Sequence, residues 1–253
     1  MSKKLLGLLL ATLLTGSAYA DEASLRKAVE AAYPKVKVES VVKTPYGGLY
    51  EIFLDGQIVY TDEKFSFLIA EGHLVEPKSR RDITGERLNE LTKVDFSTFP
   101  LSQAIKVVKG DGSRKLVVFS DPDCPFCKRL EQKELAGISD VTVYTFLYPL
   151  EQLHPDAVNK SRAIWCAPDR AKAWQDWMLN GQLAKSGECD APIEKLAELG
   201  RKLGVTGTPT LFFTNGKRIA GAYPAKDIEN ALGEALAAKK SKLKDSFKPP
   251  DPS

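Results

Sequence analysis

The chain has 253 residues and 43% hydrophobic content, which is enough for two domains with apolar cores. Its formal net charge is +3, and loss of residues 1–20 would remove two lysines and no acidic residue, leaving +1. This balance argues against nucleic acid as a partner, because nucleic-acid-binding domains carry a marked excess of basic residues.

Residues 1–20 are expected to form a cleavable signal peptide. Lys3 and Lys4 precede an apolar run from Leu5 to Leu14, and Ala18-Tyr19-Ala20 is a small-x-small cleavage site. The apolar run is about ten residues long, which is too short to span a bilayer. An uncleaved membrane anchor is the alternative. Export would place the chain in an oxidising compartment, where disulfides form and persist.

Residues 21–80 are predicted to form a small α+β domain. Ser24 can cap a short helix that ends at Pro34. Strand-like segments follow at 36–41, 49–54, 57–60, 65–69 and 73–75, with hairpin turns at Asp55-Gly56 and Glu71-Gly72. A sheet this small buries little apolar surface, so an exposed edge would favour pairing with a second copy.

Residues 81–99 are predicted to connect two domains through a helix that starts near Thr84. Its apolar positions form one narrow face, which is typical of a linker helix. The second domain is expected over residues 100–240. A lysine- and proline-rich flexible tail is expected over residues 241–253.

The second domain has its expected elements in a thioredoxin-like order. They are a strand at 115–120, a helix at 125–136, a strand at 141–147, a helical region with three tryptophans, a helix at 193–203, a hairpin at 210–220 and a helix at 225–240.

The stretch from Asp121 to Cys127 lies between the first strand and the first helix of this domain. A cysteine at a helix N-terminus faces unpaired N–H groups and the positive end of the helix dipole. Both favour the thiolate, which is the nucleophile in disulfide exchange. Pro125 suits the first helical turn, and Cys127 lies one turn beyond Cys124 on the same face, close enough for a disulfide.

Metal binding is the alternative for this Cys-x-x-Cys spacing. A structural metal site needs four ligands, and the sequence has no second Cys-x-x-Cys or histidine pair to complete them. We therefore expect no metal and no cofactor.

The chain resembles the bacterial periplasmic disulfide isomerases of the DsbC/DsbG family. The resemblance rests on the export signal, the small first domain, the linker helix, the stretch Phe119 to Cys127 and the later Gly204-Val205-Thr206-Gly207-Thr208-Pro209-Thr210. It implies a cystatin-like N-terminal dimerisation domain, a linker helix and a C-terminal thioredoxin-like fold with a helical insertion. It also implies a V-shaped homodimer in which the strand region 65–74 would be the dimer edge.

The resemblance further implies roles for individual residues. Cys124 would be the attacking cysteine and Cys127 the resolving one, together forming the redox-active disulfide. Pro209 would be the cis-proline that packs against this pair, a rare and deliberate backbone feature. The residues expected to contact an extended substrate segment are Pro125, Phe126, Thr208 and Pro209.

Four cysteines allow three disulfide pairings. The resemblance implies Cys124–Cys127 and a second, structural disulfide, Cys166–Cys189, in the helical insertion. Closing a loop of about 24 residues would stabilise the fold by roughly 3 kcal/mol in the entropy model. A second redox pair is the alternative interpretation.

One position departs from thioredoxin, which has a buried acid six residues before its first cysteine. That position is Val118 here, so the proton acceptor for Cys127 is not assigned. Asp121 and Asp123 are expected to form the turn and cap the helix. Lys128 and Arg129 are expected to face solvent.

The expected function is the rearrangement of wrong disulfides in secreted proteins, with a DsbD-like membrane thiol reductase as the electron donor. A DsbG-like reductase of oxidised single cysteines with chaperone activity is the alternative, because Pro125-Phe126 fits that branch as well. A binding module for unfolded chains is a further alternative, with candidate apolar groups at Phe126, Phe146, Tyr148 and Tyr223. A pair held oxidised in cells would instead indicate a dithiol oxidase.

Overall fold

The structure, a computed structural model, describes residues 17–185 and 187–246. The chain divides into two compact units, Met1–Leu88 and Asn89–Ser253. Residues 1–16 of the expected signal peptide and residues 247–253 of the expected tail lie outside the described residues. Within the described ranges, no helix is both long and apolar enough to cross a membrane.

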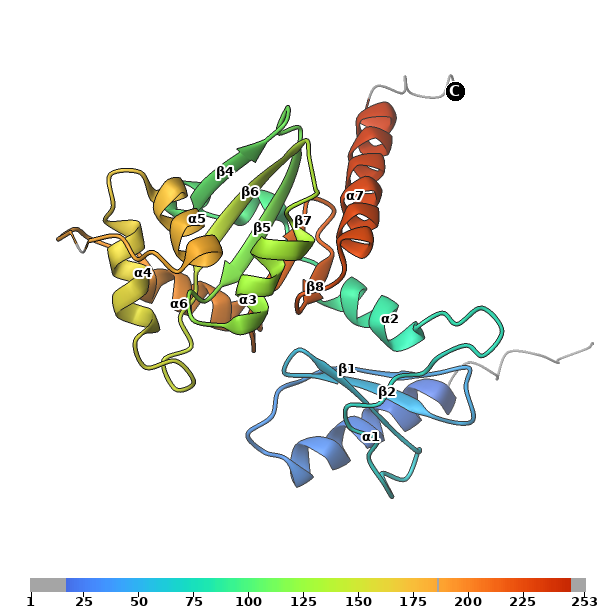
Figure 1. Ribbon diagram of the computed structural model, residues 1–253. Helices are drawn as coiled ribbons and strands as arrows, with labels where there is room; N and C mark the ends of the chain where they lie inside the picture. The colour runs from blue at the N-terminus through green and yellow to red at the C-terminus, as the bar shows by residue number, and fades with distance from the viewer. Residues whose placement is uncertain (1–16, 186, 247–253) are drawn as a thin grey trace, which may run out of the picture. The chain divides into compact units, whose positions relative to one another are not determined.

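The first unit is a helix packed on a three-stranded antiparallel sheet (Figure 1). Leu25 and Val29 lie four residues apart on the helix, and both are buried with Tyr50 and Ile52 of the sheet. Its elements are α1 (Ser17–Ala32), β1 (Val38–Lys43), β2 (Tyr50–Leu54) and β3 (Gln57–Thr61).

The hairpin predicted at Asp55-Gly56 is confirmed. Leu54 pairs with Gln57 across the turn, and Asp55 and Gly56 have positive φ angles of 46° and 79°. A two-residue type I′ turn requires positive φ at both positions, so the dipeptide fixes the register of β2 and β3.

The second predicted hairpin, which would join 65–69 to 73–75, does not form, so this prediction is wrong. Both segments are described, and they form only isolated bridges, Tyr60 with Ile69 and Val75 with Asp82. Local polar contacts compete with strand pairing. The Asp62 carboxylate accepts hydrogen bonds from the Ser66 backbone and hydroxyl, and the Thr84 hydroxyl accepts the Leu74 N–H at 2.8 Å. Thr84 belongs to α2 (Ile83–Leu91).

The second unit is built on a five-stranded sheet in the order β4-β6-β5-β7-β8. The strands are β4 (Ile105–Lys109), β5 (Arg114–Ser120), β6 (Val141–Leu147), β7 (Thr210–Phe213) and β8 (Arg218–Ala220). Among neighbouring strands of this sheet, β5 and β6 pair in parallel, and the other three pairs are antiparallel. The edge strand β4 was not predicted, because its half-buried pattern lies close to a charged turn and gives a weak signal.

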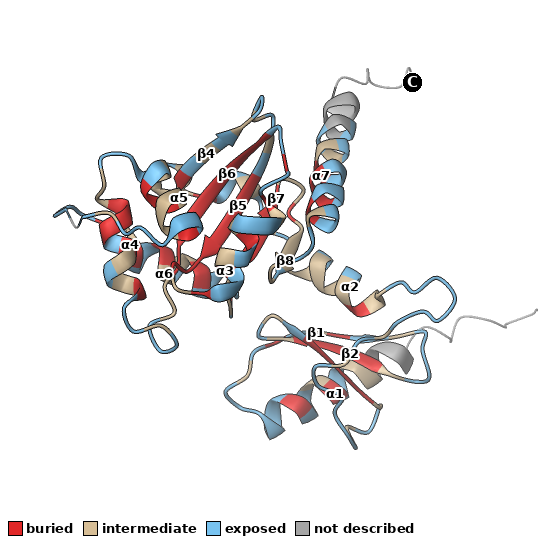
Figure 2. Ribbon diagram, viewed as in Figure 1, coloured by how far each residue is buried: buried red, intermediate tan, exposed pale blue. Residues whose placement is uncertain are grey.

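Helices cover the sheet on both faces (Figures 1 and 2). Leu116 and Val118 of β5 pack on one face in a cluster with residues of α7, whereas Val117 and Phe119 pack on the other with Phe212. The helices are α3 (Pro125–Arg129), which continues as the π-helical segment η3 (Leu130–Glu134), then α4 (Ala157–Trp165), α5 (Arg170–Asn180), α6 (Ile193–Lys202) and α7 (Ala225–Ser246). Two short 3₁₀ turns, Phe96–Thr98 and Leu101–Gln103, precede β4.

The last helix is longer than predicted. It continues to Ser246, so the first part of the flexible tail expected from residue 241 is helical. Lysine and leucine in this stretch are good helix formers, which explains why the lysine-rich composition does not end the helix.

Gly200 in α6 leaves room for a buried tyrosine ring. A Cβ at this position would collide with Tyr148, whose hydroxyl donates to the Val205 carbonyl at 3.1 Å. Gly200→Ala is therefore expected to lower the free energy of unfolding by about 1–3 kcal/mol. Gly233→Ala, at an exposed α7 position with no atom within 4 Å, is expected to raise it by about 0.5–1 kcal/mol. Urea unfolding measures both, and similar effects of the two variants would contradict this packing argument.

Candidate functional site

The two cysteines of the Cys-x-x-Cys stretch lie at the start of α3. Cys124 is the N-cap residue, with extended backbone angles, and Pro125 occupies the first helical position. The Cys124 carbonyl accepts the Lys128 N–H at 3.1 Å, which closes the first turn. Both cysteines are free thiols; Cys124 is 5% exposed and Cys127 is fully buried.

A distant loop faces Cys124. The peptide bond between Thr208 and Pro209 is cis, and Cys124 Sγ lies 3.4 Å from the Thr208 carbonyl oxygen, to which the protonated form of the thiol donates. The next residue begins β7, which pairs with β5 directly before the cysteine turn. Sheet pairing therefore brings together two stretches that are separated by 84 residues.

The predicted substrate-contacting residues surround this point of contact. Pro125 and Phe126 are exposed, Phe126 by 59%, and Pro209 is buried. Of the apolar groups expected for a chaperone surface, Phe126 and Tyr223 are exposed, whereas Phe146 and Tyr148 are buried in the aromatic core. The expectation that the latter two contribute to a binding surface is therefore wrong, because β6 is a fully buried strand and Tyr148 follows it directly.

The two thiols differ in their pKa values. Hydrogen bonding from Cys127, followed by contributions from Thr208 and the N–H groups of Cys127 and Phe126, lowers the pKa of Cys124 to about 5 despite partial burial. Burial raises the pKa of Cys127, and the neighbouring Cys124 thiolate raises it further. One cysteine is therefore a thiolate at neutral pH, while the other keeps its proton.

The pH dependence of alkylation tests this difference. The reduced protein should react with iodoacetamide at Cys124 with half the maximal thiolate-dependent rate near pH 5, because the thiolate is the nucleophile. Cys127→Ala removes the strongest hydrogen bond to that thiolate and should move the midpoint upward by about 1 unit or more. A wild-type midpoint near pH 8.5, the value of an ordinary thiol, would contradict the argument.

Asp121 organises the turn before the cysteines, and its side chain is fully buried. One carboxylate oxygen accepts the Asp123 N–H at 2.7 Å, and the other accepts the Leu150 N–H at 2.6 Å. His154 Nδ1 lies 2.9 Å from the second oxygen. Asp121 therefore forms the turn as expected. It also contacts the segment after β6, and nothing in the sequence indicated those contacts.

Two lysines and a tryptophan flank the same turn. Lys160 binds the Asp123 carboxylate at 2.8 Å, and its ammonium lies 5.1 Å from the centre of the Trp177 ring. Lys128, which was expected to face solvent, lies 4.6 Å from the same ring centre. Trp177 donates to the Pro122 carbonyl at 2.7 Å. The helical insertion thus supports the cysteine turn through Trp177.

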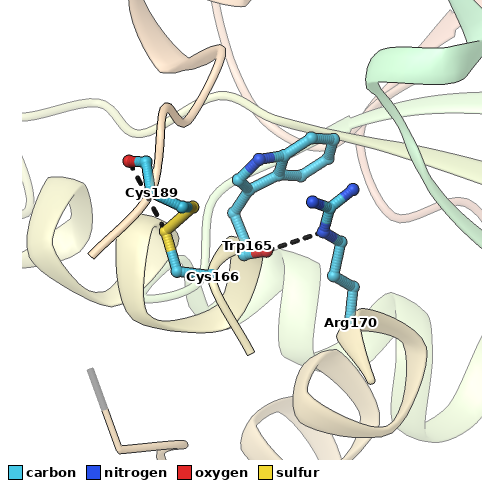
Figure 3. The surroundings of a disulfide bond; sticks show 4 residues. All are labelled: Trp165, Cys166, Arg170 and Cys189. Atoms are coloured by element: carbon cyan, nitrogen blue, oxygen red, sulfur yellow. Dashed lines mark hydrogen bonds between the residues drawn. A yellow bond between two sulfur atoms is a disulfide. The ribbon is translucent and has the colours of Figure 1, made fainter. Parts of the chain in front are cut away.

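The helical insertion carries a disulfide between Cys166 and Cys189 (Figure 3). Arg170 donates from Nε to the Trp165 carbonyl at 2.7 Å, and its guanidinium stacks 3.8 Å from the Trp165 ring centre. Trp165 packs in one apolar cluster with Cys124 and Cys127. The disulfide therefore lies next to a residue that contributes to packing around Cys124 and Cys127.

A partly buried acid is present, but it lies on a different element from the one where thioredoxin carries its buried acid. Val118 is in the core. In η3, Glu131 accepts the Trp174 indole N–H at 2.9 Å, and burial raises the pKa of this carboxyl. Glu131 lines a cavity of about 330 Å³ together with Lys109 and Thr145. No sequence signal distinguished Glu131 from the other acids of this helix.

Across the part of the chain that the structure describes, no group of three or more His, Cys, Asp or Glu side chains is arranged to hold a metal ion.

Family comparisons match both units. Residues 101–236 match the thioredoxin-like domain, and residues 16–85 match the disulfide bond isomerase protein N-terminal domain. The chain therefore combines this N-terminal domain with a thioredoxin-like domain that carries two free thiols. This combination defines a thiol:disulfide oxidoreductase of the isomerase class.

Individual proteins similar to this chain belong to the same class. The chain is 48% identical over 195 residues to the Bordetella parapertussis protein named "Probable thiol:disulfide interchange protein DsbC", covering 77% of this chain and 68% of that protein. It is 28% identical over 234 residues to thiol:disulfide interchange protein DsbC of Escherichia coli, covering 90% and 95%. The crystal structure of a disulfide interchange protein from Neisseria gonorrhoeae is 48% identical with a TM-score of 0.52, covering 54% of this chain and 98% of that one. The chain belongs to the DsbC family of thiol:disulfide interchange proteins.

Proposed function

We propose that the protein rearranges wrong disulfides in secreted proteins, with Cys124 as the attacking sulfur and Cys127 as the resolving one. The observation that carries the proposal is the Cys124 thiol at the start of α3, which faces the Thr208 carbonyl at 3.4 Å and has a pKa lowered to about 5. A thiolate at neutral pH beside a backbone able to pair with an extended chain suits attack on a protein disulfide.

The exchange is balanced at each step. The Cys124 thiolate attacks one sulfur of a substrate disulfide, so a mixed disulfide forms and the second substrate sulfur leaves as a thiolate. That thiolate can attack another disulfide in the same substrate and finally displace Cys124, which completes an isomerisation without net oxidation. Alternatively, Cys127 loses its proton and attacks Cys124, which releases a reduced substrate and leaves the Cys124–Cys127 disulfide.

The second route requires an external reductant, since two electrons pass from the protein to the substrate. We propose a membrane thiol reductase of the DsbD type for this step and the periplasm as the compartment. The expected signal peptide supports the compartment, and membership of the DsbC family supports a reductant of this type.

We further propose a homodimer formed through the N-terminal unit. The match of residues 16–85 to the isomerase N-terminal domain supports it. Phe67, Leu68 and Ile69, within the strand region expected at the dimer edge, are exposed in the single chain. Exposed apolar residues beside a small sheet are candidates for burial against a second copy.

Trapping of the mixed disulfide tests the proposal directly. Full-length Cys127→Ala should form a covalent adduct with scrambled ribonuclease through Cys124, visible on a non-reducing gel and located by mass spectrometry. The Cys124→Ser/Cys127→Ala double variant is the matched control and should form none. Equal adduct formation by both variants, or an adduct at another residue, would rule out Cys124 as the attacking sulfur.

A reductase of oxidised single cysteines with chaperone activity is the second candidate. The exposed Phe126, between the two cysteines, and the exposed Tyr223 favour it, because both offer apolar surface to a folded or unfolded client. Reduction of a sulfenic-acid protein, measured beside ribonuclease refolding, separates the two functions. Faster turnover of the sulfenic acid would favour this candidate over the isomerase.

A further inference from the structure

The segment after β6 is tied to the cysteine turn by a contact between His154 and the buried Asp121. His154 Nδ1 lies 2.9 Å from Asp121 Oδ2; the Asp121 side chain is fully buried and that of His154 is 21% exposed. His154 is itself fixed in the chain, because its N–H donates to the Leu150 carbonyl at 2.8 Å and its carbonyl accepts the Ala157 N–H at 3.0 Å. These bonds hold the backbone of His154, and the contact with Asp121 holds its imidazole.

Asp121 links this histidine to both sulfurs. The Asp121 N–H donates to Cys127 Sγ at 3.4 Å, and the Asp121 carbonyl accepts the Cys124 N–H at 3.2 Å. A shift of Asp121 would therefore move both cysteines. A carboxylate taken out of water needs a compensating positive charge or a full set of hydrogen bonds, and His154 can supply the charge.

The charges that face His154 are dominated by acids. The hydrogen bond to Asp121 raises the pKa of His154 most strongly, burial opposes it, and the charges of Asp121, Cys124 and Asp123 raise it by smaller amounts. The nearby cation, Lys160, is held by Asp123 at 2.8 Å and by Asp156 at 3.3 Å. Coupling between two charged sites is reciprocal, so an imidazolium that is favoured by the Cys124 thiolate also favours that thiolate.

We propose that His154 is a positioning residue for thiol–disulfide exchange, which as an imidazolium neutralises the buried Asp121 carboxylate and supports the Cys124 thiolate. This inference rests on the proposed role of Cys124 as the attacking sulfur. It adds a cationic group from outside the Cys-x-x-Cys helix and the cis-proline loop. Histidine suits the task because its charge changes in the pH range in which the thiolate must be maintained.

Two substitutions separate charge from hydrogen bonding. His154→Asn can keep an N–H directed at Asp121 without the charge, and His154→Lys keeps a positive charge. His73→Asn is the matched control, because His73 also pairs through Nδ1 with an aspartate, Asp82, at 2.7 Å, but in the first unit. All variants are tested as reduced full-length protein, with the circular dichroism spectrum as a check of folding.

The measurement is the rate of Cys124 carbamidomethylation as a function of pH. We expect His154→Asn to raise the midpoint by about 0.3–0.5 unit, so that the rate at pH 5 falls about 1.5- to twofold while the rate at pH 8 changes little. His154→Lys should recover most of the rate at pH 5, and His73→Asn should match the wild type. A purely structural role for His154 would instead change rates at every pH and would not respond to lysine.

The outcomes distinguish this inference from the proposed function. A wild-type midpoint near pH 5 that is unchanged in His154→Asn would overturn the role of His154 and leave the role of Cys124 intact. Absence of a low wild-type midpoint, together with failure of Cys127→Ala to trap a mixed disulfide, would overturn both.

Discussion

Replacing Cys124 with serine is expected to reduce refolding of scrambled ribonuclease to the rate measured without the protein. A serine hydroxyl at this position is not ionised at neutral pH and cannot form the mixed disulfide, so the two routes of exchange end before their first step. Loss of a covalent nucleophile costs other enzymes several orders of magnitude, and a decrease of at least about 10³-fold in the protein-dependent part of the rate is expected here. Recovery of ribonuclease activity from the scrambled form is the measurement.

Cys127→Ala gives the mechanistic contrast to this loss. Isomerisation can finish through the substrate's own thiol, so this variant should keep part of the refolding activity, whereas net reduction of a substrate disulfide needs Cys127 and should disappear. Refolding by Cys124→Ser at the wild-type rate would show that exchange starts elsewhere. Equal loss of both activities in the two variants would show that the cysteines are not divided into attacking and resolving roles.

Local sequence signals predicted the parts of the fold that depend on local chemistry. Asp55-Gly56 fixes a two-residue hairpin through its backbone preferences, and Pro125 after Cys124 fixes a helix start. Both depend on residues within one turn. The Glu71-Gly72 hairpin failed for the opposite reason, because side chains as distant as Thr84 compete for the same backbone groups.

The residues of the candidate site also divide into those that a local sequence pattern indicates and those that depend on distant parts of the chain. The spacing of Cys124 and Cys127 indicates a dithiol, whereas the contact of Cys124 with Thr208 depends on the pairing of β5 with β7, which no local pattern encodes. The resemblance to a known family supplied that contact. His154 and Glu131 had no comparable signal, because a single histidine or glutamate in a polar helical region looks like a solvent-facing residue until the fold buries its partner.

Asp121→Ala is expected to lower the free energy of unfolding of the reduced protein by about 3 kcal/mol. The substitution leaves the N–H groups of Asp123 and Leu150 without their acceptor, and each such loss in a partly buried site costs about 1–3 kcal/mol. Asp111→Ala is the matched control, because Asp111 accepts the Ser113 N–H at 2.8 Å in the same kind of turn but is exposed. Its effect should be about 1 kcal/mol or less. Urea unfolding compares the two, and equal losses would contradict the importance of burial.

The pH dependence of this loss identifies the part that comes from His154. Because Asp121 raises the pKa of His154 above its ordinary value of 6.5, the pair stabilises the folded state fully below that ordinary value. This contribution disappears as the pH rises through the raised pKa, while the backbone hydrogen bonds to Asp121 remain. The deficit of Asp121→Ala should therefore be larger at about pH 6 than at about pH 9. A deficit that is the same at both would show that the carboxylate acts through the two backbone N–H groups alone, and that the imidazolium adds nothing to the stability of the turn carrying both cysteines.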